Sequence, residues 1–140
     1  MCKVLESIIK ESMLEHLLKN GLISRAQHGF LPNKSCSTNL LETLDSISEA
    51  VAQGFPVDII YTDFAKAFDK VSHRKLLYKL KYYGFGDDLI NWIKAFLLNR
   101  SQRVVLGDVN SSWFEVSSGV PQGSVLGPLL FVIGSTYSTQ

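Results

Sequence analysis

Two carboxylates, Asp63 and Asp69, lie in a stretch of the chain whose residue types suit metal or phosphate chemistry. The stretch, residues 59–69, reads IIYTDFAKAFD, so an apolar, β-favouring run ends in Asp63 and an aromatic, Phe68, follows five residues later. A carboxylate presented at the end of a strand beside an aromatic can hold a divalent cation next to a substrate. The structural alternative is a buried strand whose aspartate caps the following helix.

A second stretch whose residue types could bind a substrate is formed by Pro121, Gln122 and Gly123. Proline fixes the backbone, glycine lets a ligand approach the chain closely, and the glutamine amide both donates and accepts hydrogen bonds. A loop of this kind before an apolar helix suits a flat, polar substrate such as a nucleotide. An ordinary turn is the alternative, because these residue types are frequent in turns.

Helical periodicity recurs along the chain and predicts the elements that must position these stretches. One expected helix begins after Ser35 or Ser37 and ends near Gln53; the others cover residues 2–19, 73–83, 87–97 and 125–133. We expect a strand after Pro56 and a hairpin formed by residues 103–106 and 113–116. Helices predominate without regular βαβ alternation, so the predicted fold class is α+β.

Composition indicates one folded domain: 140 residues, 46% hydrophobic and 19% charged. The net charge of +1 does not predict a nucleic-acid partner by itself. Arg100 and Arg103 suit either a nucleic-acid backbone or solvent. Cys2 and Cys36 lack metal-ligand spacing, so we expect no disulfide partner and a reducing, intracellular setting. No run of 18 apolar residues occurs, and we expect no membrane partner.

Three stretches in this order resemble reverse transcriptases, most closely those of non-LTR, LINE-type retrotransposons. They are residues 27–38, 61–71 and 119–131, which include QHGF, YTDFAKAFDKV and GVPQGSVLGPLLF. The resemblance runs from Cys2 to about Ile133, and the last two stretches at this spacing are highly specific.

The resemblance implies a partial right-hand polymerase. Residues 1–56 would belong to the fingers and residues 57–133 to the first half of the palm, with residues 134–140 outside the family pattern. The implied activity is RNA-directed DNA polymerisation, in which two Mg²⁺ ions assist nucleotidyl transfer from a dNTP to a DNA primer on an RNA template. The implied location of the intact protein is the cytoplasm and nucleus.

The resemblance also implies residue roles. Asp63 would be the catalytic, metal-binding aspartate, and the backbone carbonyl of Phe64 a second ligand of the same ion. Phe68 would lie under the sugar of the incoming nucleotide and exclude a 2′-hydroxyl, while Gln122 and Gly123 would pack against that nucleotide and the template base.

Lys34 is a candidate phosphate contact, with a solvated loop lysine as the alternative. His73 fits the start of a helix and shows no setting for a general base.

The family continues with an Ala-Asp-Asp turn that supplies two further carboxylates, and these 140 residues contain no such turn. Asp87 and Asp88 suit a helix start and do not replace it. We therefore expect weak Mg²⁺ binding, no polymerase activity of this chain alone, and an uncovered apolar patch on residues 126–131. The alternative is a non-catalytic retroelement remnant or an interaction module for nucleic acid or protein.

Overall fold

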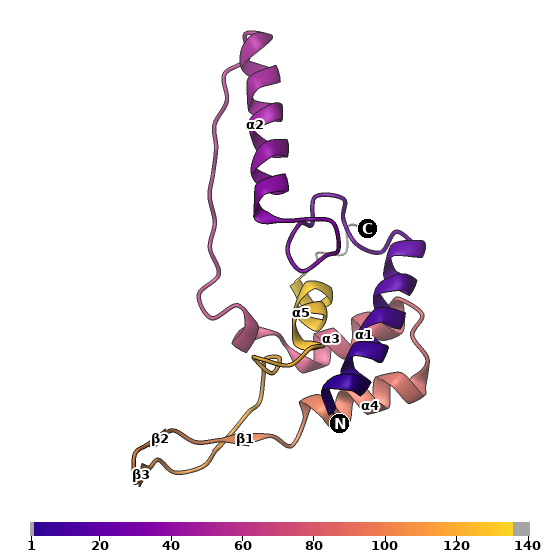
Figure 1. Ribbon diagram of the computed structural model, residues 1–140, viewed down its shortest axis with the longest axis vertical. Coiled ribbons are helices and arrows are strands. Elements are labelled where there is room, and N and C mark those ends of the chain that lie inside the picture. Colours follow the sequence, from indigo (N-terminus) through magenta and orange to yellow (C-terminus); the bar gives the residue numbers. More distant parts are fainter. Residues whose placement is uncertain (1, 136–140) are drawn as a thin grey trace. The chain divides into compact units, whose positions relative to one another are not determined.

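The computed structural model describes residues 2–135 of the chain. The chain divides into two compact units (Figure 1), the first comprising Met1–Leu22 and Lys66–Gln140 and the second Ile23–Ala65. Most of the expected tail, residues 136–140, lies outside the described residues. Within the described range, none of the helices is both long and apolar enough to cross a membrane.

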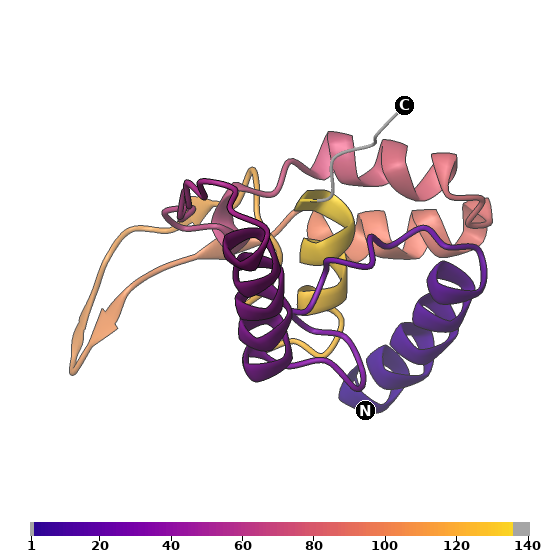
Figure 2. The ribbon, with the colours of Figure 1, turned by 90° about the horizontal axis from the view of Figure 1, so that it is seen from above.

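The first unit is built mainly from helices, and its four α-helices begin and end within a few residues of their predicted positions, whereas the short 3₁₀ helix was not predicted. They are α1 (Cys2–Lys19), the short 3₁₀ helix η1 (Phe68–Lys70), α3 (His73–Tyr82), α4 (Asp87–Leu97) and α5 (Gly127–Ser135). Figure 2 shows α3 and α4 running beside each other, and α3 also packs against α5.

Local signals account for where these helices begin. The hydroxyl of Ser72 accepts a hydrogen bond from the backbone N–H of Lys75, so Ser72 caps α3, as a serine directly before a periodic apolar segment indicates. Gly86 precedes α4, and Asp87 and Asp88 lie in its first turn, where the helix dipole favours negative charge. The predicted position of these two aspartates at a helix start is confirmed, but neither caps the helix, because the N-cap is Gly86 and no side chain donates or accepts a capping hydrogen bond there.

The core of this unit gathers around α5, contrary to the expectation of an uncovered patch. Leu126, Leu129 and Leu130 are at most 1% exposed, and Phe131 is half-buried. The fully buried side chains of α1, α3 and α4 are Met13, Leu17, Leu76, Leu80, Ile93 and Leu97, and those of α5 also include Val132 and Ile133. The prediction was wrong because α5 packs against α3 and its leucines are buried within this unit without any further strand.

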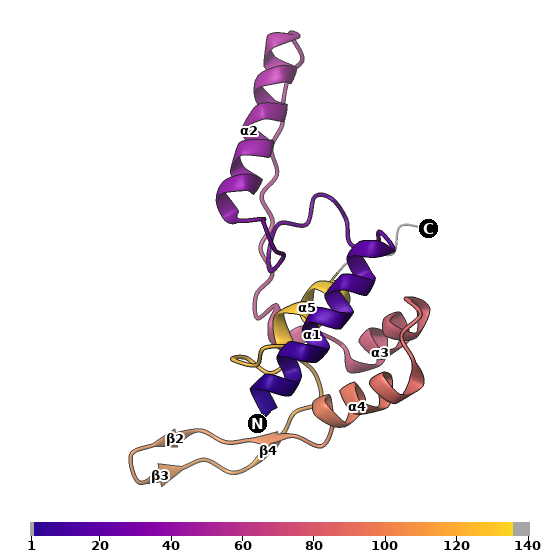
Figure 3. The same cartoon turned by 45° about the vertical axis from the view of Figure 1, so that its right-hand side comes forward.

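A hairpin forms in the predicted region, but its strands are shorter than expected and the two predicted strands, residues 103–106 and 113–116, pair with other partners. β1 (Ser101–Gln102) pairs with β4 (Phe114–Glu115), and β2 (Val105–Leu106) pairs with β3 (Val109–Asn110), both antiparallel. Figures 1 and 3 show the hairpin extending beyond the helices of its unit, and every strand residue is exposed. An exposed two-stranded ribbon has few packing contacts, which explains the short ladders.

The second unit contains α2 (Cys36–Ala52), which has no buried side chain. The structure selects Ser35 over Ser37 as its cap. The Ser35 hydroxyl accepts from the backbone N–H of Thr38, and the Thr38 hydroxyl accepts from that of Ser35, which is a capping box.

The strand predicted after Pro56 does not form. Residues 55–64 are extended without strand pairing, and Ile60 and Tyr61 are 86% and 84% exposed. A strand requires a hydrogen-bonded neighbour, and in residues 2–135 the ladders are those of the hairpin alone. The β-favouring composition of this segment therefore yields extended backbone but no sheet.

The core assignment predicts a contrast between two leucines. Leu80→Ala should lower the free energy of unfolding by about 2–5 kcal/mol, because Leu80 is fully buried. Leu40→Ala, on the exposed surface of α2, should change it by no more than about 0.5 kcal/mol. Urea denaturation followed by circular dichroism measures both, and equal effects would contradict the proposed core.

Candidate functional site

Two of the sequence stretches singled out above are hydrogen-bonded to each other within the first unit. We call residues 118–124 the PQG loop and residues 68–71 the FDKV segment. The backbone N–H of Gly119 donates to the carbonyl of Val71 (2.8 Å), and that of Val120 donates to the carbonyl of Phe68 (3.0 Å). The loop is thereby docked on the segment through main-chain groups.

Asp69 adds two side-chain links between the loop and the segment. The Ser118 hydroxyl donates to the Asp69 carbonyl (2.8 Å), and the Gln122 amide donates to the Asp69 carboxylate (3.4 Å). The structure therefore brings Gln122, a predicted nucleotide contact, next to Asp69. The sequence alone gave no sign of this pairing across 53 residues.

Glycine is required at position 119. Its φ of +90° is rarely adopted by other residues, and a Cβ there would lie 2.7 Å from the Cα of Asp69. Gly123 also has a positive φ (+79°), but nothing lies within 4 Å of the position that a Cβ would occupy. Gly123 thus leaves open space beside the backbone, as a close approach by a ligand would need.

The carbonyl of Gly119 accepts hydrogen bonds from two side chains of other elements. His73 Nε2 donates at 2.7 Å, and Arg100 Nη2 donates at 2.9 Å. His73 is buried, whereas Arg100 is half-buried and also donates through Nε to the Leu97 carbonyl (2.8 Å). Desolvation by burial lowers the pKa of Arg100, but a guanidinium remains protonated in proteins.

Neither of these contacts was predicted. The sequence predicted that His73 lies at a helix start, which is correct. For Arg100 it left two interpretations open, a contact with a nucleic-acid backbone or exposure to solvent. Their shared partner is a backbone carbonyl 46 and 19 residues away, respectively. No side-chain pattern in the sequence marks such an acceptor.

The junction between the PQG loop and α5 is held by Glu6 of α1. One oxygen of its buried carboxylate accepts from the backbone N–H groups of Val125 (2.8 Å) and Leu126 (3.1 Å). A carboxylate at these unpaired N–H groups satisfies them and complements the helix dipole. Sequence reasoning missed Glu6 because its partners lie about 120 residues away.

Phe68 is half-buried and stacks on Phe131 of α5. The ring centroids are 4.5 Å apart, and the planes are inclined by 15°. This contact holds the Phe68 ring in a defined orientation at the edge of the core.

Asp63 and Phe64 belong to the second unit, so they are separated from Phe68 and the PQG loop by the unit boundary at Ala65. Both residues are exposed on the extended segment. A carboxylate and a backbone carbonyl are oxygen ligands of the type that Mg²⁺ prefers. No group of three His, Cys, Asp or Glu side chains among residues 2–135 is arranged to hold a metal ion.

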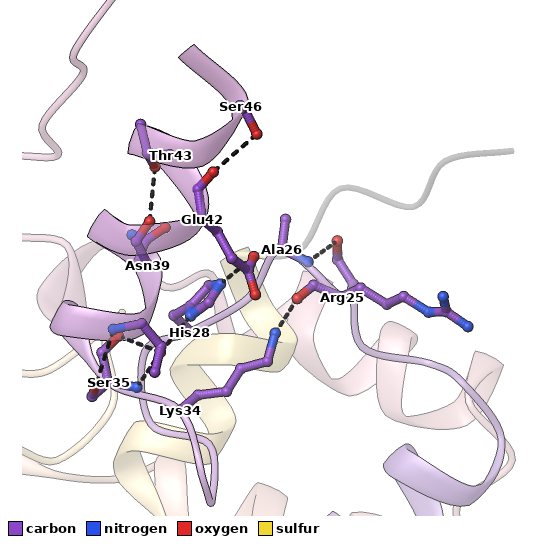
Figure 4. Close-up of polar contacts among 11 residues, drawn as sticks. Arg25, Ala26, His28, Lys34, Ser35, Asn39, Glu42, Thr43 and Ser46 are labelled. Carbon is purple, nitrogen blue, oxygen red and sulfur yellow. Dashed lines mark hydrogen bonds and ion pairs between the residues drawn. The ribbon is translucent and has the colours of Figure 1, made fainter. Parts of the chain in front are cut away.

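Lys34 also lies in the second unit, in the loop before α2. Its ammonium group donates to the carbonyl of Arg25 (Figure 4). The same loop is anchored by His28, which is buried between the Thr38 hydroxyl (Nδ1, 2.9 Å) and the Glu42 carboxylate (Nε2, 3.0 Å). These contacts fix the loop that carries Lys34 against α2.

Comparison with known proteins identifies the family of this chain. The family model described as "Reverse transcriptase (RNA-dependent DNA polymerase)" matches residues 1–137. The chain therefore belongs to the reverse transcriptase family.

Several relatives are named as proteins of non-LTR mobile elements, which confirms the predicted type of reverse transcriptase domain. The "RNA-directed DNA polymerase from mobile element jockey" of Drosophila melanogaster is 32% identical over 131 residues, covering 94% of this chain and 14% of the relative. A "Probable RNA-directed DNA polymerase from transposon X-element" of the same species is 30% identical over 139 residues. That match covers 95% of this chain and 14% of the relative.

A third relative is the "Retrovirus-related Pol polyprotein from type-1 retrotransposable element R2" of Popillia japonica, 30% identical over 81 residues. That match covers 58% of this chain and 13% of the relative. The chain thus spans about a seventh of the length of these curated relatives.

The close approach at Gly119 predicts a graded effect of two alanine substitutions. Gly84→Ala places a side chain at a positive φ in open space and should cost about 1–2 kcal/mol of unfolding free energy. Gly119→Ala adds the overlap with Asp69 and should cost about 1–3 kcal/mol more. Urea unfolding of both variants measures the difference, and equal losses would contradict the docking geometry.

Proposed function

We propose that this chain is part of an RNA-directed DNA polymerase, with residues 1–56 in the fingers and residues 57–133 in the palm. The reaction is transfer of a nucleotidyl group from a dNTP to a DNA primer, with RNA as the template and release of pyrophosphate. The observation that carries the proposal is the docking of the PQG loop on the FDKV segment, which joins two family stretches through main-chain hydrogen bonds. Family membership gives the class of reaction.

The PQG loop and Phe68 are proposed to bind the incoming nucleotide. Gly123 leaves its backbone open to a ligand, and Gln122 is exposed with its amide at Asp69. The Phe68 ring, oriented by Phe131, would lie under the sugar and oppose a 2′-hydroxyl. Lys34 is the proposed phosphate contact from the fingers, because an ammonium suits phosphate as a point charge.

Asp63 is the proposed catalytic carboxylate. Its side chain and the Phe64 carbonyl would hold Mg²⁺, which neutralises charge on the phosphate oxygens when bound. Phosphoryl transfer depends on positioning and charge stabilisation, so the contribution of this chain is to hold substrate groups in place. Further carboxylates must complete a two-ion site in the whole protein, whose proposed location is the cytoplasm and nucleus.

The proposal predicts that substitutions of Asp63 and Asp58 affect primer extension differently, although both residues are exposed carboxylates of the same extended segment. In the longer protein that contains this chain, Asp63→Asn should lower the rate of primer extension at least about a hundredfold, because metal-assisted charge stabilisation amounts to several kcal/mol. Asp58→Asn is the matched control and should leave the rate nearly unchanged. Primer extension on an RNA template measures both, and an active Asp63→Asn variant would overturn the assignment.

The 140-residue chain alone should not extend a primer. It contains Asp63 but no Ala-Asp-Asp turn, so one family carboxylate is present. The assay is extension of a labelled DNA primer on RNA with dNTPs and Mg²⁺, in which the longer protein serves as the positive control. Detectable extension by the purified chain would contradict the proposed need for further carboxylates.

A further inference from the structure

The Gly119 carbonyl is a junction of three elements. It lies in the PQG loop and accepts from His73 at the start of α3 and from Arg100, which follows α4. We propose that His73 and Arg100 are positioning residues that fix the PQG loop through the Gly119 carbonyl. The significance for nucleotide binding rests on the function proposed above, but the positioning itself does not.

The contacts hold one peptide unit from both sides. The oxygen of the Gly119–Val120 peptide receives His73 and Arg100, and its N–H, on Val120, donates to the Phe68 carbonyl. A carbonyl oxygen has two lone pairs, so both are occupied. The orientation of this peptide is therefore fixed by the FDKV segment at its N–H and by His73 and Arg100 at its oxygen. Pro121 follows directly, and its fixed φ limits the backbone freedom between this peptide and Gln122.

His73 has this contact as its one hydrogen bond among the described residues. Its ring is buried, and Nδ1 is buried without a hydrogen-bond partner in residues 2–135. Because the acceptor of Nε2 is a carbonyl, the tautomer that fits carries its proton on Nε2. The polar function of this side chain within the fold is thus to donate to Gly119.

Arg100 is oriented by the end of α4. Its Nε donates to the Leu97 carbonyl, which directs Nη2 toward Gly119. A hydrogen bond from a charged donor is stronger than one from a neutral donor. His73 begins α3 and Arg100 follows α4, and these two helices pack against each other. Both donors therefore come from neighbouring parts of the same helical pair.

The test is amide hydrogen exchange by NMR on the 140-residue chain without nucleotide or metal. The probes are the N–H groups of Gly119 and Val120, and core amides of α3 report global opening. His73→Leu removes the donor and should speed exchange at the two probes about fivefold to tenfold beyond any change in the core, the factor for one net hydrogen bond. His73→Gln retains an N–H donor and should restore slow exchange.

His16→Leu is the matched control. His16 Nε2 also hydrogen-bonds a backbone carbonyl, that of Tyr83 at 2.8 Å, within the same unit. His16→Leu should change the exchange rates at Gly119 and Val120 by no more than it changes those of the core amides. If His73→Leu accelerates the probes and the core by the same factor, or if His73→Gln fails to restore protection, the positioning role is overturned.

Arg100 provides a second, independent variant should His73→Leu fail to fold. Arg100→Met keeps most of the stem, removes the donors and should again speed exchange selectively at Gly119 and Val120. Lys79→Met is its control, because Lys79 Nζ donates to the carbonyl of Ile133 (2.9 Å) in the same unit. Equal effects of the two substitutions on the probes would refute the proposal. These outcomes do not depend on polymerase activity, so they are distinguishable from failure of the Asp63 test.

Discussion

The rest of the first unit depends on the pair of backbone hydrogen bonds that join the PQG loop to the FDKV segment. These bonds link groups about 50 residues apart, and they require the close approach that glycine allows at position 119. Each neutral bond contributes only about 0.5–1.5 kcal/mol net, so the junction relies on several contacts acting together. Ser118, Gln122, His73 and Arg100 provide these further contacts.

Around this junction, α5 links the loop to the hydrophobic core. Its leucines are buried, it packs against α3, and Glu6 satisfies two backbone N–H groups at its start. The loop is thus fixed at one end by polar contacts and at the other by a buried helix. A nucleotide-binding loop held in this way would meet its substrate in a preorganised form, which lowers the ordering cost of binding.

The second unit shows the opposite situation. The segment that carries Asp63 is extended and exposed, and α2 has no buried side chain. Its order comes from local contacts, namely the capping box of Ser35 and the buried His28 between Thr38 and Glu42. Asp63, the proposed catalytic carboxylate, therefore lies on a segment in which every residue from 55 to 64 is exposed.

The sequence by itself determined the features that rest on neighbouring residues. The helix positions, the Ser72 cap and the presence of a hairpin follow from periodicity, side-chain capping and turn chemistry within a few residues. The tertiary structure alone decided that residues 57–61 lack a strand partner, that α5 is covered, and that Glu6, His73 and Arg100 hold the loop. The physical reason is that sheet pairing, burial and hydrogen bonds to backbone carbonyls join residues far apart in the chain, and the side-chain types along the sequence do not specify such partners.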